Sequence, residues 1–305
     1  MFDLDSVREF VRARYDGGPI TRSGLRSRTA GVPTFSIVMP SFNQERFIER
    51  SLLSVINQDY PGTELIVVDG GSRDSTARVL DKYADDINVR ICEPDRGQSD
   101  ALNKGFARAT GEIYGWLNSD DLYCPGAFEH AARIFREQPD VQVVYGDWYT
   151  IGEDDAIQER YLSLACSRKR LITEGFFCNA QAMFWRAELH EKFGEFDIRL
   201  HRTMDYDLML RLTMRAGERA FYRTGRPLGC FRRYAGQKTS GFDQQVRDEH
   251  RLIAQNAGVT WKYSWGGRAL RLAYRLTRVG EYLESGGGGY VWWKLTGRNN
   301  PYART

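Results

Sequence analysis

Residues 112–121 read Glu-Ile-Tyr-Gly-Trp-Leu-Asn-Ser-Asp-Asp, a short apolar stretch that ends in two adjacent aspartates. The apolar part predicts a strand, and the acidic pair falls where that strand stops. Two ionised carboxylates side by side repel each other, and neither is easily buried without a partner. Hard cations such as Mg²⁺ and Mn²⁺ bind one or two carboxylates together with substrate phosphate oxygens. The stretch therefore indicates a metal-bridged phosphate site, although acidic pairs also occur in ordinary solvated turns.

The surrounding chain alternates strands with helices. Apolar runs predict strands at 35–39, 64–68, 89–91 and 141–145, and helical periodicity predicts helices at 46–57, 76–83, 100–109 and 126–137. Such alternation predicts a parallel, doubly wound sheet whose ligands bind at the carboxyl ends of its strands. Residues 41–43, Asp69 and residues 118–121 follow three of these strands. We therefore expect them to lie along one edge of the sheet.

Composition sets the broad class of the protein. The 305 residues are 42% hydrophobic and 27% charged, which is typical of a soluble globular chain with room for one large domain. A net charge of +3 gives no reason to expect a nucleic-acid partner. Five scattered cysteines without a CxxC pair favour reduced thiols. With no visible secretory signal and no apolar run of about 18 residues, we expect a cytoplasmic protein.

Three segments are expected along the chain. Residues 1–32 hold a short helix at 3–15 and a linker, residues 33–241 form the main domain, and residues 242–305 form a helical extension. In that extension arginines recur at helical spacing beside an apolar face formed by Leu272, Leu276, Val279 and Leu283. Two interpretations remain open: the helix lies on an anionic membrane surface, or it packs on the main domain with its arginines in water.

Motifs in the main domain resemble those of family 2 glycosyltransferases, which have the GT-A fold. The resemblance covers about residues 33–241 and is nearest to bacterial enzymes of O-antigen and exopolysaccharide synthesis. The runs that carry it are Ser36–Asn43, Glu64–Thr76, Asp95–Gly105, Asn118–Asp121, Gly194–Asp197, Asp205–Arg211 and Phe231–Thr239. The implied fold is α/β, with a Rossmann-like, mostly parallel central sheet, helices on both faces and a helical C-terminal tail. Neither a G-x-G-x-x-G nor a Walker lysine motif is present, which argues against the usual dinucleotide and P-loop sites.

The resemblance implies inverting transfer of a sugar from a nucleotide diphosphate sugar, with UDP favoured, to a hydroxyl of a glycan or lipid-linked glycan. The implied donor-binding residues are Pro40, Ser41, Asn43, Asp69, Gln98, Lys104, Asn118, Ser119 and Asp120. Asp120 and Asp121 would hold Mn²⁺ or Mg²⁺. An aspartate at position 69 can accept a hydrogen bond from an imide N–H of a base, or simply form the turn before Gly70. Lys104 is either a donor contact or a solvated helix charge.

Two positions depart from the family pattern at the metal. Asn118 stands where the family has the first aspartate of its Asp-x-Asp motif, and Tyr234 stands where a histidine can complete the metal shell. A protonated phenol is a poor ligand for Mn²⁺. In the same loop the resemblance implies diphosphate contacts from Arg232, Gln237 and Lys238; a solvated basic loop is the alternative.

Asp205 is the expected catalytic base, because it matches the aspartate of the family's Glu-Asp pair. Met204 replaces the glutamate. A first-turn carboxylate also stabilises a helix start, which is the alternative role for Asp205 or Asp207. We expect acceptor contacts from Gln181, Trp185 and His201, which offer amide, aromatic and imidazole groups.

Two rival functions stay open with this fold. One is a sugar nucleotidyltransferase, which would carry a glycine- and basic-rich sequence where residues 40–43 read Pro-Ser-Phe-Asn. The other is a catalytically impaired binding or scaffold protein, an interpretation that the departures at Asn118, Met204 and Tyr234 permit.

Overall fold

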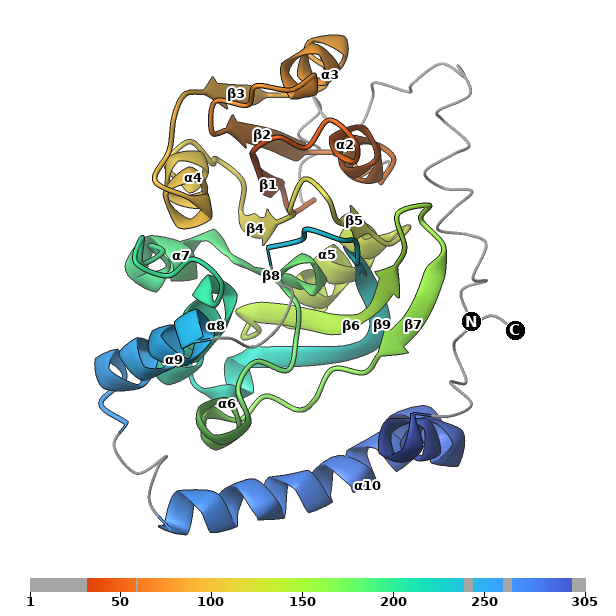
Figure 1. The fold of residues 1–305 in the computed structure, drawn as a ribbon, viewed down its shortest axis with the longest axis vertical. Helices are drawn as coiled ribbons and strands as arrows, with labels where there is room; N and C mark the ends of the chain where they lie inside the picture. Colours follow the sequence, from red (N-terminus) through yellow and green to blue (C-terminus); the bar gives the residue numbers. More distant parts are fainter. Residues whose placement is uncertain (1–31, 59, 239–243, 260–264, 298–305) are drawn as a thin grey trace.

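The computed structural model describes residues 32–58, 60–238, 244–259 and 265–297 (Figure 1); the helix expected at 3–15 lies outside them. Its centre is a nine-stranded sheet with the order β3-β2-β1-β4-β8-β6-β9-β5, and β7 pairs with β6. The strands are β1 (Phe35–Ser41), β2 (Thr63–Asp69), β3 (Val89–Cys92), β4 (Ile113–Trp116), β5 (Leu122–Tyr123), β6 (Val143–Ile151), β7 (Ile157–Tyr161), β8 (Met183–Arg186) and β9 (Phe221–Arg232). The helices are α2 (Ile48–Ile56), α3 (Thr76–Lys82), α4 (Gln98–Phe106), α5 (Ala127–Glu137), α6 (Arg168–Glu174), α7 (Ala187–Phe193), α8 (Met204–Ala216), α9 (Gln244–Asn256) and α10 (Trp265–Thr296), with short 3₁₀ turns η1 (Ala180–Ala182) and η2 (Glu218–Ala220).

The first half of the sheet is parallel. β1 pairs with β2 and β4, and β2 pairs with β3. All seven residues of β1 are buried, which explains its near-continuous apolar sequence. The strand continues through Pro40, where the sequence predicts a stop. Pairing with β4 ends at Val38, so the missing N–H of Pro40 interrupts no ladder on that side.

The second half of the sheet is mixed, and β5, β7 and β8 run against the other six strands. The predicted α/β class with a mostly parallel sheet is therefore confirmed. The strand expected at 141–145 is longer, because β6 continues to Ile151 beside β9. The irregular register between β6 and β9 around Asp147 breaks the simple alternation from which such a strand is predicted.

A glycine in the 95–105 segment brings α4 close to the sheet. A Cβ atom on Gly105 would lie 2.4 Å from Val38 Cγ1 and 3.2 Å from Val68 Cγ2. Only glycine therefore lets α4 approach β1 and β2 so closely. The last residue of the 95–105 motif thus has a packing role, and it fixes the start of α4 at the carboxyl edge of the sheet.

The two C-terminal helices differ in how they join the body. Ile253 and Ala254 of α9 belong to the main hydrophobic core, so α9 is part of the same packed unit as the sheet. Figure 1 shows α10 along the lower side of the molecule, next to α6. It is joined there by two ion pairs, Arg170 to Glu281 (2.6 Å) and Arg278 to Glu174 (2.6 Å), and by a small hydrophobic cluster of Tyr290 and Trp293 with Leu162. No helix in the described residues is long and apolar enough to span a bilayer.

Candidate active site

The ends of β1 and β2 form one corner of the site. The register pairs Ser41 with Asp69, so these strand ends lie side by side as expected. The buried Asp69 carboxylate accepts hydrogen bonds from the backbone N–H (2.9 Å) and the hydroxyl of Ser72. Asn43 has a φ of 52°, which asparagine tolerates better than most residues, and its N–H donates to the Ser72 hydroxyl (2.7 Å). Ser72 therefore ties the two loops together.

Gln98, Asn118 and Lys238 bring three further segments to this edge. The Gln98 amide donates to Asn118 Oδ1 (2.6 Å), and Lys238 Nζ donates to Gln98 Oε1 (3.4 Å). The Trp116 indole N–H also donates to Asn118 Oδ1 (2.7 Å). Burial of the ammonium lowers the pKa of Lys238. The contacts place a basic group beside the strand end that carries the aspartate pair.

The two adjacent aspartates have different surroundings. Asp121 is fully buried; its Oδ1 accepts from the backbone N–H of Arg232 (2.8 Å) and its Oδ2 from the Asn118 amide (3.0 Å). Asp120 is half-buried, and its Oδ2 accepts from the Tyr234 hydroxyl (2.9 Å). The Arg232 guanidinium donates to the Asp120 carbonyl (2.7 Å). Both oxygens of Asp121 therefore accept hydrogen bonds from neighbouring residues, whereas one oxygen of Asp120 does.

Burial raises the pKa of both aspartates, and the charge of Asp120 raises the pKa of Asp121 further. Burial and the charge of Asp120 raise the pKa of Tyr234 to about 12. The phenol therefore stays protonated and donates its hydrogen bond at neutral pH. Two carboxylates that are costly to ionise make a position where a bound cation is stabilising.

The aspartate pair can supply one free carboxylate oxygen to a hard divalent cation. Asp120 Oδ1 accepts no hydrogen bond from another residue in the described part of the chain. The described residues contain no group of three or more histidine, cysteine, aspartate or glutamate side chains that could hold a metal. Mg²⁺ and Mn²⁺ do not need such a cage, since one carboxylate with phosphate oxygens and water suffices. Asp121, expected as a second ligand, is fully buried with both oxygens hydrogen-bonded, so the structure does not present it to a metal.

Asp205 lies in the first turn of α8 and is half-buried. Its Oδ1 accepts a hydrogen bond from the backbone N–H of Tyr206 (2.8 Å). Burial raises its pKa to about 6, and the nearby Glu249 carboxylate acts in the same direction. Burial thus outweighs the helix dipole that would keep the group acidic. A carboxylate that is ionised at pH 7 with a pKa near 6 suits a general base.

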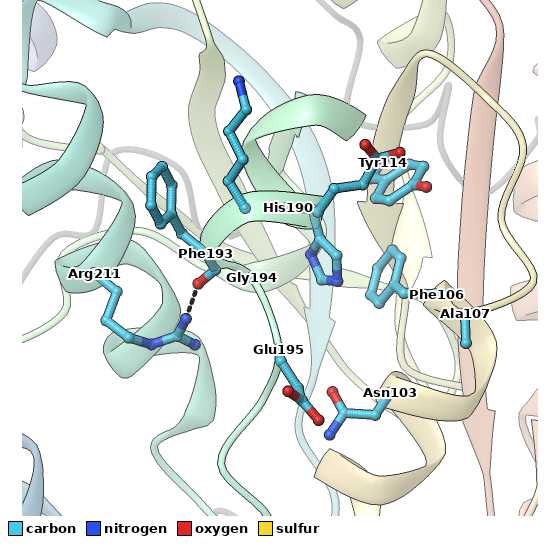
Figure 2. A pocket seen from close by; sticks show the side chains of 11 residues that line it. Asn103, Phe106, Ala107, Tyr114, His190, Phe193, Gly194, Glu195 and Arg211 are labelled. Atoms are coloured by element: carbon cyan, nitrogen blue, oxygen red, sulfur yellow. Dashed lines mark hydrogen bonds between the residues drawn. The ribbon is translucent and has the colours of Figure 1, made fainter.

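A groove of about 560 Å³ lies elsewhere, between α4, β4, α7 and α8 (Figure 2). Figure 2 shows the Arg211 guanidinium hydrogen-bonded to the Phe193 carbonyl at one side and the rings of Phe106, Tyr114 and His190 at the other. Burial lowers the pKa of His190 to about 4, so this imidazole is neutral. The groove lies at the end of α4 away from Gln98, and none of the predicted donor residues lines it.

The family is decided by comparison with known proteins. Residues 36–193, just over half of the chain, match the family profile described as glycosyl transferase family 2. The chain belongs to glycosyl transferase family 2. A PGL/p-HBAD biosynthesis glycosyltransferase of Mycobacterium bovis is 30% identical over 183 residues, which cover 59% of this chain and 69% of that protein. An uncharacterized glycosyltransferase of Rickettsia prowazekii is 28% identical over 191 residues, 59% of this chain and 58% of the relative's length.

Solved structures of similar fold include the following two. Residues 1–349 of Staphylococcus aureus TarS superpose with a TM-score of 0.58 at 19% identity, covering 73% of this chain and 64% of that one. Glucosyl-3-phosphoglycerate synthase of Mycobacterium tuberculosis, solved with Mn²⁺ and UDP, gives a TM-score of 0.51 at 18% identity, covering 75% and 81%. At these identities the likeness establishes the fold of this family 2 member and nothing more.

Two of the three residues for which we expected acceptor contacts, Trp185 and Gln181, are buried in the structure. Trp185 is fully buried on β8, with its ring 5.6 Å from that of Phe106 and its N–H donating to His190 (3.3 Å). It is a core residue and offers no face to a sugar. Gln181 is also fully buried, packed against Gly229 of β9. The sequence indicates residue type but not which side of β8 faces the core. His201 is exposed beside Gly97 at the start of α4, and its contact to an acceptor stays a prediction.

Three basic-loop and donor assignments also change. Lys104 pairs with Glu93 (2.8 Å) and Asp100 (3.6 Å), so its ammonium is already neutralised and is not available to phosphate. Arg232 is fully buried, pairs with Asp155 (2.7 Å) and holds the Asp120 carbonyl, which makes it a structural support rather than a diphosphate contact.

Gln237 donates to the Arg232 carbonyl (2.6 Å) and closes its own loop. Among the three residues of this loop for which we expected diphosphate contacts, Lys238 is the one directed to the donor edge. Pro40 and Ser119 lie buried within the edge, as parts of β1 and of the 118–121 turn.

One residue of the site is missed by the sequence analysis. Glu249 of α9 is buried and accepts hydrogen bonds from the turn that leads into α8. It lies 46 residues after Thr203, outside every family motif. A lone glutamate in a polar helix carries no local pattern that would predict this contact.

Proposed function

We propose that this chain is an inverting glycosyltransferase that moves a sugar from a nucleotide diphosphate sugar to a hydroxyl of a glycan or lipid-linked glycan. The observation that supports this most is the half-buried Asp205, whose pKa of about 6 matches the need of a general base, at the start of α8. Membership of glycosyl transferase family 2 supports the reaction class.

The donor edge fits a uridine diphosphate sugar. The Asp69 carboxylate can accept the imide N–H of uracil in addition to its bonds from Ser72. Structures of TarS with UDP and UDP-GlcNAc, and of the Mycobacterium synthase with UDP, support uridine over other bases. Lys238 forms no ion pair with another described residue, and we assign it to the diphosphate together with Gln98 and Asn118.

Asp120 would hold Mn²⁺ or Mg²⁺ through Oδ1, in keeping with the Mn²⁺ complex of the Mycobacterium synthase. When bound, such a cation neutralises the negative charge that collects on the departing diphosphate. Tyr234 holds the other oxygen of Asp120 and so fixes the direction in which Oδ1 points. Asp121 holds the turn in place by its bonds to Arg232 and Asn118.

In the transfer itself, Asp205 takes the proton of the acceptor hydroxyl. The acceptor oxygen forms a bond to the anomeric carbon of the donor, on the face opposite the diphosphate. The bond from the anomeric carbon to the phosphate oxygen breaks, and its electron pair leaves with the nucleotide diphosphate. Attack from the opposite face inverts the anomeric centre. Asp205 ends protonated and returns its proton to water, which its pKa of about 6 allows at neutral pH.

The C-terminal helix supports a place at the inner face of the membrane and a role in cell-surface polysaccharide synthesis. In the described part of α10 the polar residues Arg278 and Glu281 face the body, whereas Leu272, Leu276 and Leu283 are exposed. Beyond the kink at Gly287, Trp292 and Leu295 are exposed as well. We assign this leucine face to an anionic lipid surface, which would bring a lipid-linked acceptor close. Flotation with anionic vesicles tests it: L276D should abolish co-flotation while leaving the ion pairs to α6 intact.

The two rivals predict different ligands. A sugar nucleotidyltransferase binds a nucleoside triphosphate, and a scaffold protein binds a donor without turnover. The direct experiment is a thermal-shift panel of nucleotide diphosphates and nucleotide sugars with and without Mn²⁺, followed by a nucleotide-release assay on the sugars that bind. We expect UDP and a UDP-sugar to raise the melting temperature more with Mn²⁺ than without it. Binding without release in the presence of glycan acceptors would favour the scaffold, and no stabilisation by any diphosphate would overturn the enzyme assignment.

A further inference from the structure

A buried glutamate of α9 caps the helix that carries Asp205. Glu249 is 5% exposed, and its Oε2 accepts hydrogen bonds from the backbone N–H groups of Arg202 (3.0 Å) and Thr203 (3.0 Å) and from the Thr203 hydroxyl (2.8 Å). Its Oε1 accepts from the backbone N–H of His201 (3.1 Å). Hydrogen bonds to an ionised carboxylate are about twice as strong as neutral ones. One side chain therefore holds the whole turn that enters α8.

This arrangement replaces the usual local cap. Helix starts leave N–H groups without partners, and the side chain of the N-cap residue normally accepts from one of them. Thr203 is the N-cap of α8 but its side chain makes no such bond; its hydroxyl donates to Glu249 instead. Asp205 lies two residues further and accepts from the backbone N–H of Tyr206. Its orientation therefore depends on where the first turn of α8 is held, and α9 holds it.

Glu249 also acts on the charge of the site. Its carboxylate raises the pKa of Asp205, adding to the effect of burial, and it raises the pKa of Lys238 against the lowering by burial. The buried Cys178 thiol also interacts with Asp205, and burial raises its pKa far above neutrality. Arg202 interacts with Lys238. Of these groups only Glu249 is a charge of the same sign as Asp205.

We infer that Glu249 is a positioning residue for the catalytic base: by holding the turn that enters α8, it fixes the orientation of Asp205. The inference rests on the proposed function of Asp205. In this chain Met204 stands before the base where the family pattern has a glutamate, and α9 supplies a carboxylate from a remote segment instead. Glu249, and not the rest of α9, then acts on the catalytic base, which a purely structural cap would not require.

The test compares Glu249→Gln with Asp248→Asn, the neighbouring carboxylate on the exposed side of α9. Wild type should lose activity below about pH 6 as Asp205 is protonated. E249Q removes the like charge, so the acid limb of kcat/KM should move to lower pH, and kcat should fall on the order of 10- to 100-fold from lost alignment. Donor KM should change little. D248N should match wild type in every respect.

Two further measurements extend the test, and the first of them does not depend on E249Q being well folded. Thr203→Val removes one hydrogen bond but keeps the Glu249 charge, so kcat should fall while the acid limb stays in place. NMR titration of the Asp205 carboxyl carbon, which needs no turnover, should give a lower pKa in E249Q than in wild type. An unchanged Asp205 pKa together with an unchanged kcat would overturn the inference. If wild type turns over no donor, the proposed function fails, while the NMR titration still decides whether Glu249 controls Asp205.

Discussion

The turn after β4 and the start of α8 both carry carboxylates whose pKa is raised by burial, yet Asp121 and Asp205 differ in how many of their oxygens accept hydrogen bonds. After β4, Asp121 is hydrogen-bonded on both oxygens and Asp120 on one. At α8, Asp205 accepts from the backbone of the next residue, and the surrounding donors go to Glu249. This difference indicates that the role of each of these carboxylates follows from how many hydrogen bonds its oxygens already accept. In these two regions, the carboxylate that accepts hydrogen bonds on both oxygens holds the turn, and the carboxylates that accept on one oxygen can take a proton or a metal.

The largest effect is expected for Asp205→Asn, which keeps the shape of the side chain but cannot accept a proton. We expect kcat to fall on the order of 10²–10⁴-fold, the usual contribution of a positioned base. Donor affinity, measured by calorimetry with UDP and Mn²⁺, should stay the same because Asp205 makes no contact to the donor edge. Full turnover with unchanged donor binding would remove Asp205 from the chemistry and leave only a helix-capping role.

The second prediction concerns the saturated region. Arg232→Met removes the 2.7 Å ion pair to Asp155, which keeps Arg50 as a partner (2.9 Å), and frees the Asp120 carbonyl. We therefore expect the free energy of unfolding to drop by about 1–3 kcal/mol. Denaturant titration measures it. Arg233→Met is the matched control, since Arg233 is exposed and lies 3.8 Å from Glu159. If R232M unfolds like wild type and instead weakens UDP binding, Arg232 is a diphosphate contact after all.

The contrast between the regions also explains what the sequence could predict. The edge formed by Ser41, Asp69 and Asn118 was predicted because parallel strands must bring their carboxyl ends together, so position along the chain determines position in space. Asp205 was found by its place in a motif.

Burial and remote pairing were not predictable in the same way. Trp185 and Arg232 carry side chains typical of sugar and phosphate sites, but β8 and β9 lie in the mixed half of the sheet, where the register decides which residues face the core. Lys104 and Glu249 depend on partners that no spacing rule connects to them. Residue chemistry alone therefore overestimates contact with the ligand in that half.

Substitutions of Tyr234 test whether the metal binds at Asp120. Tyr234→His places a good Mn²⁺ ligand beside Asp120, while Tyr234→Phe removes the 2.9 Å hydrogen bond without adding one. We expect Mn²⁺ affinity in the presence of UDP to rise on the order of tenfold in Y234H. In Y234F it should stay within a few-fold of wild type. Paramagnetic resonance titration of Mn²⁺ gives both values without turnover, and equal affinities in all three proteins would place the metal away from Asp120.

The smallest expected effect separates two lysines that the sequence treats alike. Lys238 lies 3.4 Å from Gln98 and forms no ion pair with a described residue, whereas Lys104 is neutralised by Glu93 and Asp100. Lys238→Met should raise donor KM several-fold. This corresponds to a loss of about 1 kcal/mol of binding free energy for one partly solvated charged contact. Lys104→Met should leave donor KM unchanged and cost at most about 1 kcal/mol of stability, as expected for exposed pairs. Measuring donor KM and unfolding for both variants decides the matter. A rise in donor KM for K104M, and none for K238M, would mean that an ion-paired lysine can still bind the donor. The absence of an ion pair would then not distinguish a binding lysine from a structural one.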